Sequence, residues 1–179
     1  MSLIVLATGG ARSGKSAWAQ GIAESWDRCR VYIATATPHD DEMCARVERH
    51  RQMRAGRGWA TLEEPFDLAG ALERAAKSYP VALVDCLTVW LSNRMYQAEQ
   101  AGQALSEPMV ADECSRMVDA ARRLSIGAVF VSGEVGLGIV PDNAVARRFR
   151  DLLGICNQMI AGRADEVTLL VCGQPLRIK

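Results

Sequence analysis

The stretch Gly9-Gly10-Ala11-Arg12-Ser13-Gly14-Lys15-Ser16 fits the pattern G-x-x-x-x-G-K-[ST]. It follows a short apolar run at residues 3–7 and opens a segment, 16–26, that is predicted to be helical. A strand, a glycine-rich loop and a helix in this order form the context that a phosphate-binding loop requires. Glycines let backbone N–H groups surround phosphate oxygens, and the helix N-terminus adds partial positive charge. We therefore expect these eight residues to hold nucleotide phosphates; an ordinary glycine turn is the alternative.

Three side chains have expected roles in phosphate chemistry. Lys15 can reach the β- and γ-phosphates as a catalytic cation, and the Ser16 hydroxyl can bind Mg²⁺. Asp85 follows four apolar residues, 81–84, and so stands at the carboxyl end of a predicted strand. Open α/β sheets bind ligands beyond these strand ends, which makes Asp85 the expected second metal ligand. The alternative for Asp85 is a carboxylate that only caps the strand.

The rest of the chain alternates predicted strands and helices. Apolar runs predict strands at residues 3–7, 31–35, 81–84, 128–131, 167–172 and 176–178. Spacing and composition predict helices at 16–26, 40–54, 67–78, 87–97, 106–124 and 142–161, the last capped by Asp142. Gly56, Gly58 and Pro65 are expected to punctuate a loop, and Gly173-Gln174-Pro175 a hairpin. Continuously apolar strands between helices predict an α/β fold whose mostly parallel sheet is covered on both faces.

Composition narrows the class of protein. A length of 179 residues suits one domain, so we expect residues 1–179 to form a single nucleotide-binding domain. Twenty-one basic residues balance twenty-one acidic ones, which argues against a dedicated nucleic-acid binder or a polybasic membrane anchor. No apolar run is long enough to cross a bilayer, and residues 1–7 are too short for a signal peptide.

The six cysteines lack the spacing of a zinc site. Three of them, Cys86, Cys114 and Cys172, lie in apolar segments. This pattern predicts buried, reduced thiols in a cytoplasmic protein.

A histidine within an arginine-rich predicted helix is a candidate nucleophile. Met43, Val47 and His50 are spaced to share one helix face. The nearby arginines are Arg46, Arg49, Arg51, Arg54 and Arg57. A neutral imidazole can attack an α-phosphorus, and arginines can stabilise the departing pyrophosphate. The alternative is a core histidine, with the arginines serving the helix dipole. The other histidine, His39, lies in a turn and has no assigned role.

A second glycine-rich segment, residues 134–141, reads Glu-Val-Gly-Leu-Gly-Ile-Val-Pro. It is too rich in glycine for a helix and too apolar for a plain solvated loop. Because it follows a predicted buried strand, it is expected at the same sheet edge as the phosphate-binding loop. Two interpretations remain open. The segment closes over a substrate with Glu134 facing the site, or it is a packing turn into the next helix.

Taken together, these motifs resemble the bifunctional adenosylcobinamide kinase / adenosylcobinamide-phosphate guanylyltransferase family of cobalamin biosynthesis. The resemblance runs nearly end to end. The residues that carry it are Gly9 to Ser16, Tyr32-Ile33-Ala34-Thr35, Asp40-Asp41-Glu42-Met43 through Arg46 to His50-Arg51, Glu63-Glu64-Pro65, Asp85-Cys86-Leu87-Thr88, Glu134 to Pro141, Arg148-Phe149-Arg150-Asp151 and Ala164-Asp165-Glu166-Val167. The loop at Gly9 and the segment at Glu134 are the most specific of these matches.

The resemblance implies two reactions. A nucleoside triphosphate, ATP or GTP, phosphorylates the aminopropanol hydroxyl of adenosylcobinamide. GTP then guanylylates a histidine, and the GMP passes to adenosylcobinamide phosphate to give adenosylcobinamide-GDP. His50 matches the guanylylated position. Some relatives carry two adjacent histidines there, whereas this chain has Arg49 before His50.

The resemblance also implies a RecA-like P-loop fold, a homotrimer and a set of GTP contacts. Those contacts are Gly9 to Ser16, Thr35, Ala36, Thr37, Arg51, Arg54, Glu63 and Asp85. One departure concerns Gly133, where family members often have Asn, and it bears on the corrinoid contact rather than on the nucleotide.

Two other functions remain as alternatives. The first is a simple P-loop small-molecule kinase in which His50 is structural. The second is a P-loop ATPase that serves a macromolecular partner, which the neutral charge disfavours for nucleic acid.

Overall fold

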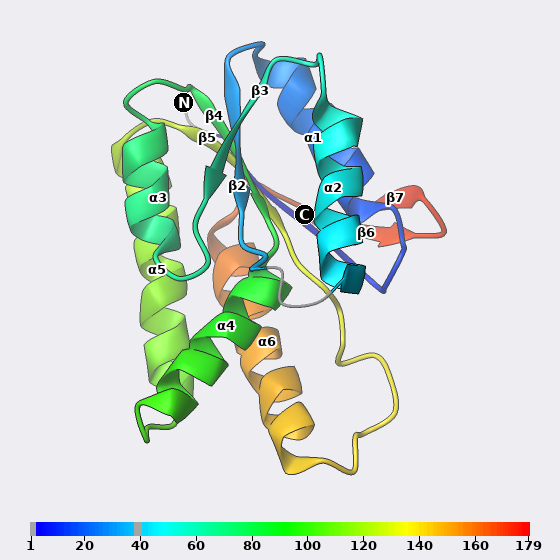
Figure 1. Ribbon diagram of the computed structural model, residues 1–179, viewed down its shortest axis with the longest axis vertical. Helices are drawn as coiled ribbons and strands as arrows, with labels where there is room; N and C mark the ends of the chain where they lie inside the picture. The colour runs from blue at the N-terminus through cyan, green and yellow to red at the C-terminus, as the bar shows by residue number, and fades with distance from the viewer. Residues whose placement is uncertain (1–2, 38–40) are drawn as a thin grey trace.

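The computed structural model describes residues 3–37 and 41–179, apart from the side chains of Glu42, Met43 and Arg46. Within these ranges, seven strands form one sheet in the order β3-β2-β4-β5-β1-β6-β7 (Figure 1). The strands are β1 (Ile4–Gly9), β2 (Arg30–Ala34), β3 (Trp59–Glu63), β4 (Val81–Asp85), β5 (Gly127–Val131), β6 (Glu166–Val171) and β7 (Gln174–Arg177). Neighbouring strands are parallel except β6 and β7, which are antiparallel. The predicted mostly parallel sheet with a C-terminal hairpin is confirmed.

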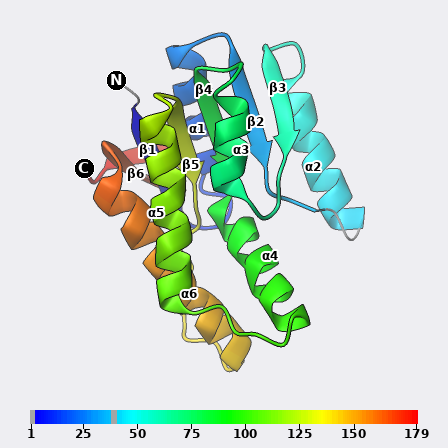
Figure 2. The same cartoon turned by 90° about the vertical axis from the view of Figure 1, so that its left-hand side faces the viewer.

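Helices cover both faces of this sheet. They are α1 (Lys15–Trp26), α2 (Asp41–Arg54), α3 (Leu68–Ala75), α4 (Leu87–Gln100), α5 (Glu107–Arg123) and α6 (Ala144–Arg163). Helix α1 packs on one face, and α3, α5 and α6 pack on the other (Figure 2). Helix α2 stands beside α1 near the sheet edge formed by β2 and β3 (Figure 1).

The strands are buried on both sides, which explains why they read as unbroken apolar runs. Val5 and Ala7 of β1 pack toward α1, whereas Ile4 and Leu6 pack toward the opposite helices. Successive side chains along a strand therefore point alternately into two hydrophobic cores, one on each face of the sheet, rather than into one core and solvent. The same alternation decides on which face of the sheet each polar side chain at a strand end lies.

Strand β3 corrects the expectation of a loop between Gly56 and Pro65. It pairs in parallel with β2 at the edge of the sheet, and its residues are half-buried or exposed. A half-exposed edge strand carries no continuous apolar run, so its sequence lacks the signal that marks β4 and β5. Trp59 anchors its start, because its indole N–H donates to Glu24 Oε1 at 2.8 Å and the Arg30 guanidinium lies 4.9 Å from its ring centre.

The hairpin turn and one helix cap also differ from expectation. The turn falls on Cys172 and Gly173, whose φ angles are +52° and +78°, as a two-residue hairpin loop demands. Cys172 is exposed there, so its predicted burial is wrong; Cys114 is buried and Cys86 is half-buried. The α6 cap is Asn143 rather than Asp142, since the Asn143 side chain accepts hydrogen bonds from the first N–H groups of the helix. The helices of the described ranges include none that could cross a membrane.

Candidate active site

The phosphate-binding loop joins β1 to α1. Gly14 directly precedes the helix with a φ of +93°, and a Cβ there would lie 3.2 Å from the Cα of Gly173. The hairpin turn braces the loop, because the N–H of Gly173 donates to the carbonyl of Ser13 at 3.0 Å. Lys15 Nζ donates to the carbonyl of Gly10 at 2.8 Å, so the lysine lies across the loop. The strand–loop–helix context predicted for this motif is therefore present.

The carboxyl ends of three strands meet beside this loop. Strand β5 lies between β1 and β4, and Val131 pairs with Ala7 on one side and with Asp85 on the other. Asp85 stands at the end of β4, as the sequence predicts. Glu134 follows β5, and its backbone N–H donates to the carbonyl of Gly9 at 3.0 Å. Both carboxylates thus lie at the sheet edge that carries the phosphate-binding loop.

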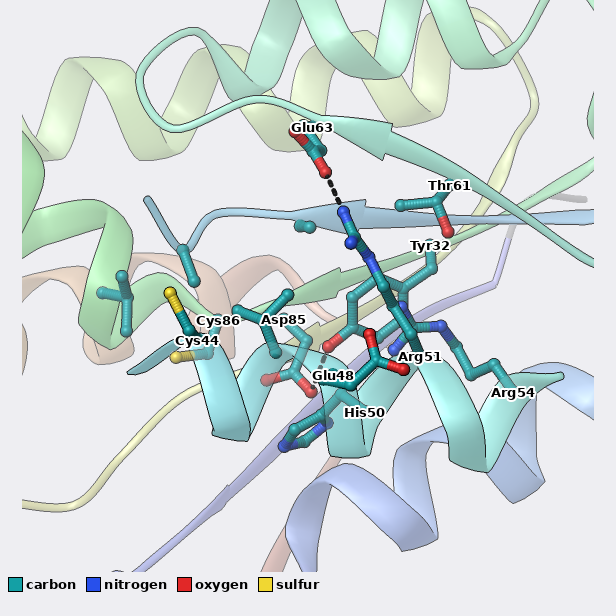
Figure 3. A pocket seen from close by; sticks show the side chains of 14 residues that line it. Tyr32, Cys44, Glu48, His50, Arg51, Arg54, Thr61, Glu63, Asp85 and Cys86 are labelled. Atoms are coloured by element: carbon teal, nitrogen blue, oxygen red, sulfur yellow. Dashed lines mark hydrogen bonds and ion pairs between the residues drawn. The ribbon is translucent and has the colours of Figure 1, made fainter. Parts of the chain in front are cut away.

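A pocket of about 420 Å³ is lined by α2 and by the ends of β2, β3 and β4 (Figure 3). Six of its lining residues were linked to nucleotide chemistry by the sequence or by the family resemblance: Ala36, His50, Arg51, Arg54, Glu63 and Asp85. Residues 9–16 do not line it. The candidate residues therefore divide between the phosphate-binding loop and this pocket, which we call the α2 pocket.

A stacked cation and a tyrosine connect α2 to the end of β4. The Arg54 guanidinium lies 3.5 Å from the ring centre of Tyr32, and the Tyr32 hydroxyl donates to Asp85 Oδ2 at 3.0 Å. Burial, reinforced by the nearby Asp85 carboxylate, raises the pKa of Tyr32 well above its usual value, so the tyrosine remains a hydrogen-bond donor. Burial lowers the pKa of Arg54, against the opposing effects of Tyr32 and Asp85.

The buried arginine is suited to an anionic ligand. Arg54 is 5% exposed, and its Nε and Nη1 atoms have no hydrogen-bond partner within the described part of the chain. A buried donor without a partner costs free energy, more so when it is charged. The Arg54 guanidinium lines the same pocket as His50, so it offers hydrogen-bond donors to a phosphate group beside an imidazole that can act as a nucleophile.

Comparison with known proteins identifies the group to which these features belong. The family described as cobinamide kinase / cobinamide phosphate guanyltransferase matches residues 5–178. The chain belongs to this family. The bifunctional adenosylcobalamin biosynthesis protein CobU of Salmonella typhimurium is 37% identical over 183 residues, which cover 99% of this chain and 100% of the relative. The corresponding protein CobP of Pseudomonas aeruginosa is 39% identical over 175 residues, covering 97% and 96%.

Membership of this family gives the two activities of the chain. The chain is a bifunctional kinase and guanylyltransferase of adenosylcobalamin biosynthesis, so the recognition made from the motifs is confirmed.

Solved structures confirm the RecA-like fold. A KaiC-like protein from Pyrococcus horikoshii and the RadB recombinase both align with a TM-score of 0.51 over 93% of this chain. Their alignments cover 70% and 73% of the matched chains, at 12% and 13% identity, which supports the fold alone.

The two arginines of the α2 pocket differ in their surroundings. Arg51 Nη2 forms an exposed ion pair with Glu63 Oε1 at 2.6 Å (Figure 3), whereas Arg54 is buried over Tyr32. His50 is half-buried and lines the same pocket as Val47, as their helical spacing predicts. The side chain of Met43, also predicted on that face, lies outside the description, as do residues 38–40 with His39.

Thr35 fixes the backbone of the residue that follows Asp85. Its side chain is fully buried, its hydroxyl donates to the carbonyl of Cys86 at 2.9 Å, and the N–H of Cys86 donates back to that hydroxyl at 2.8 Å. Asn93 adds a hydrogen bond to the Thr35 carbonyl at 2.8 Å. Thr35 is a predicted GTP contact, but its hydroxyl is engaged in fixing the chain just after Asp85. Thr37, at the end of the same segment, is half-buried and does not line the α2 pocket.

The donor set fits a magnesium ion held mainly by a nucleotide. Among the described residues, no three His, Cys, Asp or Glu side chains cluster to form a protein-only metal cage. One hydroxyl, Ser16, and one carboxylate, Asp85, suit Mg²⁺, which usually keeps waters and substrate phosphates as its other ligands. The Tyr32 hydroxyl occupies Asp85 Oδ2 and so orients this carboxylate.

Tyr32 is the residue that sequence reasoning missed. It stands within a quoted family motif but received no role, because a tyrosine in a buried strand looks like core. The observation that points to Tyr32 is the register between β2 and β4. Ala34 pairs with Asp85, so Tyr32 lies two positions earlier on the same face of the sheet. That pairing cannot be derived from the spacing of residues along the chain.

Proposed function

We propose that the α2 pocket is the guanylylation site, with His50 as the nucleophile. The observation that carries this proposal is the convergence of His50, the buried Arg54 and Asp85 on one pocket outside the phosphate-binding loop. A P-loop clamps the β- and γ-phosphates for attack at the γ-phosphorus. Attack at the α-phosphorus by His50 needs GTP to enter this pocket or α2 to move toward the loop.

In the proposed step, an imidazole nitrogen of His50 attacks the α-phosphorus of GTP. A nitrogen–phosphorus bond forms, and the bond from the α-phosphorus to the bridging oxygen breaks, so pyrophosphate leaves with the electron pair. Arg54 then stabilises the charge on pyrophosphate in a site poor in water, where a fixed cation acts strongly. The phosphate of adenosylcobinamide phosphate next attacks the guanylyl-histidine, which yields adenosylcobinamide-GDP and frees His50.

The kinase step is assigned to the phosphate-binding loop, residues 9–16. ATP or GTP lies in the loop, and Lys15 neutralises charge on the β- and γ-phosphates as the γ-phosphoryl group moves to the hydroxyl of adenosylcobinamide. When bound, Mg²⁺ would add Lewis-acid stabilisation of the phosphates through Ser16 and Asp85. The remaining predicted contacts, Ala36, Thr37, Arg51 and Glu63, are proposed to surround GTP at the α2 pocket.

Three further expectations remain part of this proposal. The single sheet that unites all described strands supports one nucleotide-binding domain. All six cysteines are in the thiol form, which suits the reducing conditions of a cytoplasm. The homotrimer rests on the family resemblance and is tested by the molar mass in solution.

Covalent labelling tests the nucleophile. The protein is mixed with Mg²⁺ and GTP labelled at the α-phosphorus, then denatured, and protein-bound label is measured. His50→Ala is compared with His39→Ala, which removes the only other histidine. We expect label that is acid-labile and base-stable, retained in His39→Ala and absent from His50→Ala.

The alternative of a kinase without guanylyl transfer makes the opposite forecast. Under conditions in which GTP binds, wild-type protein would then carry no label at all. Label that persists in His50→Ala would instead place the intermediate on another residue. Either result would overturn the assignment of His50.

A further inference from the structure

Glu134 is a carboxylate at the phosphate-binding loop for which the proposed reactions so far have no use. It lies just beyond β5, the strand between the loop-bearing β1 and the Asp85-bearing β4. Its backbone N–H bonds to the carbonyl of Gly9, the first residue of the loop. Glu134 therefore lies directly beside the start of the phosphate-binding loop.

One oxygen of this carboxylate is fixed by two donors. Oε1 accepts from the Thr8 hydroxyl at 2.9 Å and from Asn157 Nδ2 at 2.8 Å. Asn157 is 7% exposed on α6, and its amide also bonds to the Gly133 carbonyl at 3.0 Å and accepts from the Ser132 hydroxyl at 2.6 Å. The buried amide thus holds three consecutive residues of the turn in one position.

Among the described residues, neither the second carboxylate oxygen of Glu134 nor its negative charge has a partner. Within the described ranges, Glu134 Oε2 accepts no hydrogen bond, and no lysine or arginine pairs with the carboxylate. A fixed negative charge beside a loop that binds polyanions weakens phosphate binding. A glutamine would accept the same two hydrogen bonds without this cost. The presence of a glutamate rather than a glutamine therefore indicates that the negative charge itself takes part in the reaction.

The two faces of the sheet edge separate this carboxylate from the α2 pocket. Val131 and Tyr32 belong to the core on the α1 side, which is also the side of Asp85 and α2. Thr8 and Asn157 place the Glu134 side chain on the opposite, α6 side. A nucleotide in the loop thus has Asp85 on one flank and Glu134 on the other.

We propose that Glu134 is the general base of the kinase reaction and touches the acceptor hydroxyl of cobinamide. The hydroxyl oxygen attacks the γ-phosphorus and forms a new phosphorus–oxygen bond. The bond from the γ-phosphorus to the β–γ bridging oxygen breaks, and the nucleoside diphosphate leaves with its electron pair. The hydroxyl proton passes to Glu134 Oε2, while Oε1 stays held by Thr8 and Asn157, and is then released to solvent.

The chain that follows Glu134 gives the acceptor a surface from which to approach. Leu137, Ile139 and Val140 are 81%, 96% and 60% exposed. Their loop is held from α6, since Arg150 Nη2 donates to the carbonyl of Gly136 at 2.9 Å. A large ring substrate can cover these apolar side chains while its hydroxyl reaches the carboxylate, which places the acceptor on the flank away from α2.

The bifunctional enzyme supplies its own control for this proposal. Glu134→Gln keeps the shape of the side chain and an oxygen for Thr8 and Asn157, but it removes the base. Asp142→Asn removes an exposed carboxylate from the same connection and serves as the matched control. Two reactions are measured for each protein: phosphorylation of cobinamide by ATP, and covalent labelling by α-labelled GTP.

We expect Glu134→Gln to lower kcat of the kinase by about 10²-fold to 10⁴-fold, the usual contribution of a general base. Covalent labelling by GTP stays within twofold of wild type, which also shows that the variant is folded. Asp142→Asn leaves both reactions unchanged. Because the kinase is measured apart from labelling, a wild-type protein without label would refute the guanylylation proposal, while the kinase rates of Glu134→Gln and Asp142→Asn, with thermal unfolding as the check on folding, would still test the base.

Three outcomes would overturn the role of Glu134. Kinase kcat within threefold of wild type would make the carboxylate dispensable. A higher KM with unchanged kcat would limit it to binding the acceptor. An equal loss of kinase and labelling would show that it supports the loop rather than the proton transfer.

Discussion

The phosphate-binding loop and the α2 pocket, the two sites proposed to bind nucleotide phosphates, are built by different means. The loop uses backbone N–H groups, two tightly packed glycines and a lysine, all within eight consecutive residues. The α2 pocket uses side chains from α2, β2 and β4, with Arg54 buried over Tyr32 and Tyr32 bonded to Asp85. The first site depends on local chain geometry, and the second depends on how distant strands pair. A substitution therefore affects each site through a different physical cause.

The largest expected effects come from removing the cation of one site or of the other. Lys15→Met is expected to lower kinase kcat by about 10³-fold, because a cation that stabilises the transferring phosphoryl group is lost. Arg54→Met is expected to lower the rate of covalent labelling by GTP by about 10²-fold and to leave the kinase within threefold of wild type. The measurement is the pair of half-reaction rates for each variant.

The stability of Arg54→Met sharpens the same contrast. Two buried nitrogens of Arg54 lack partners within the described residues, so their removal relieves a desolvation cost and offsets the lost stacking on Tyr32. We expect the free energy of unfolding to stay within about 1 kcal/mol of wild type. Equal losses of both activities in either variant would contradict the division into two sites.

A smaller effect concerns the backbone of the loop. A Cβ on Gly9 would lie 2.6 Å from the carbonyl oxygen of Leu170 and 2.7 Å from Ser13 Oγ, whereas a Cβ on Gly10 meets nothing within 4 Å. Gly9→Ala is therefore expected to lower the free energy of unfolding by about 1–3 kcal/mol, as overpacking does. It is also expected to abolish the kinase activity. Gly10→Ala is the matched control and should be close to wild type in denaturant-induced unfolding. Similar stability of both variants would show that β6 does not confine the loop.

This division also explains what the sequence could predict. The loop, Asp85 and the parallel sheet are visible in the chain because each is a contiguous pattern, an apolar run ending in glycines or in a carboxylate. Strand β3 was missed because an edge strand is half-exposed. Tyr32, and the contrast between buried Arg54 and exposed Arg51, follow from the pairing of β2 with β4 and from the way α2 lies over it. No spacing in the sequence encodes that arrangement.

The smallest expected effect lies at the opposite end of the loop-bearing strand. The N–H of Ile4, at the start of β1, donates to Asp165 Oδ2 at 2.7 Å, and Arg122 Nη2 donates to Asp165 Oδ1 at 2.7 Å. The hydrogen bond from Arg122, aided by that from Ile4, lowers the pKa of Asp165 in the folded protein. The stabilisation is therefore present above the unfolded pKa, about 3.9, and is lost as the pH falls through the folded value.

Asp165→Asn is expected to reduce the free energy of unfolding at pH 7 by about 1 kcal/mol or less, because the ion pair is partly exposed and screened. The difference from wild type should begin to shrink as the pH falls below the unfolded pKa and should vanish below the lower folded pKa, because Asp165 is then protonated and as neutral as asparagine. Chemical unfolding between pH 3 and pH 7 measures this, with Asp112→Asn, an exposed carboxylate on α5, as the control. A difference that does not change with pH would mean that shape rather than charge holds the start of β1.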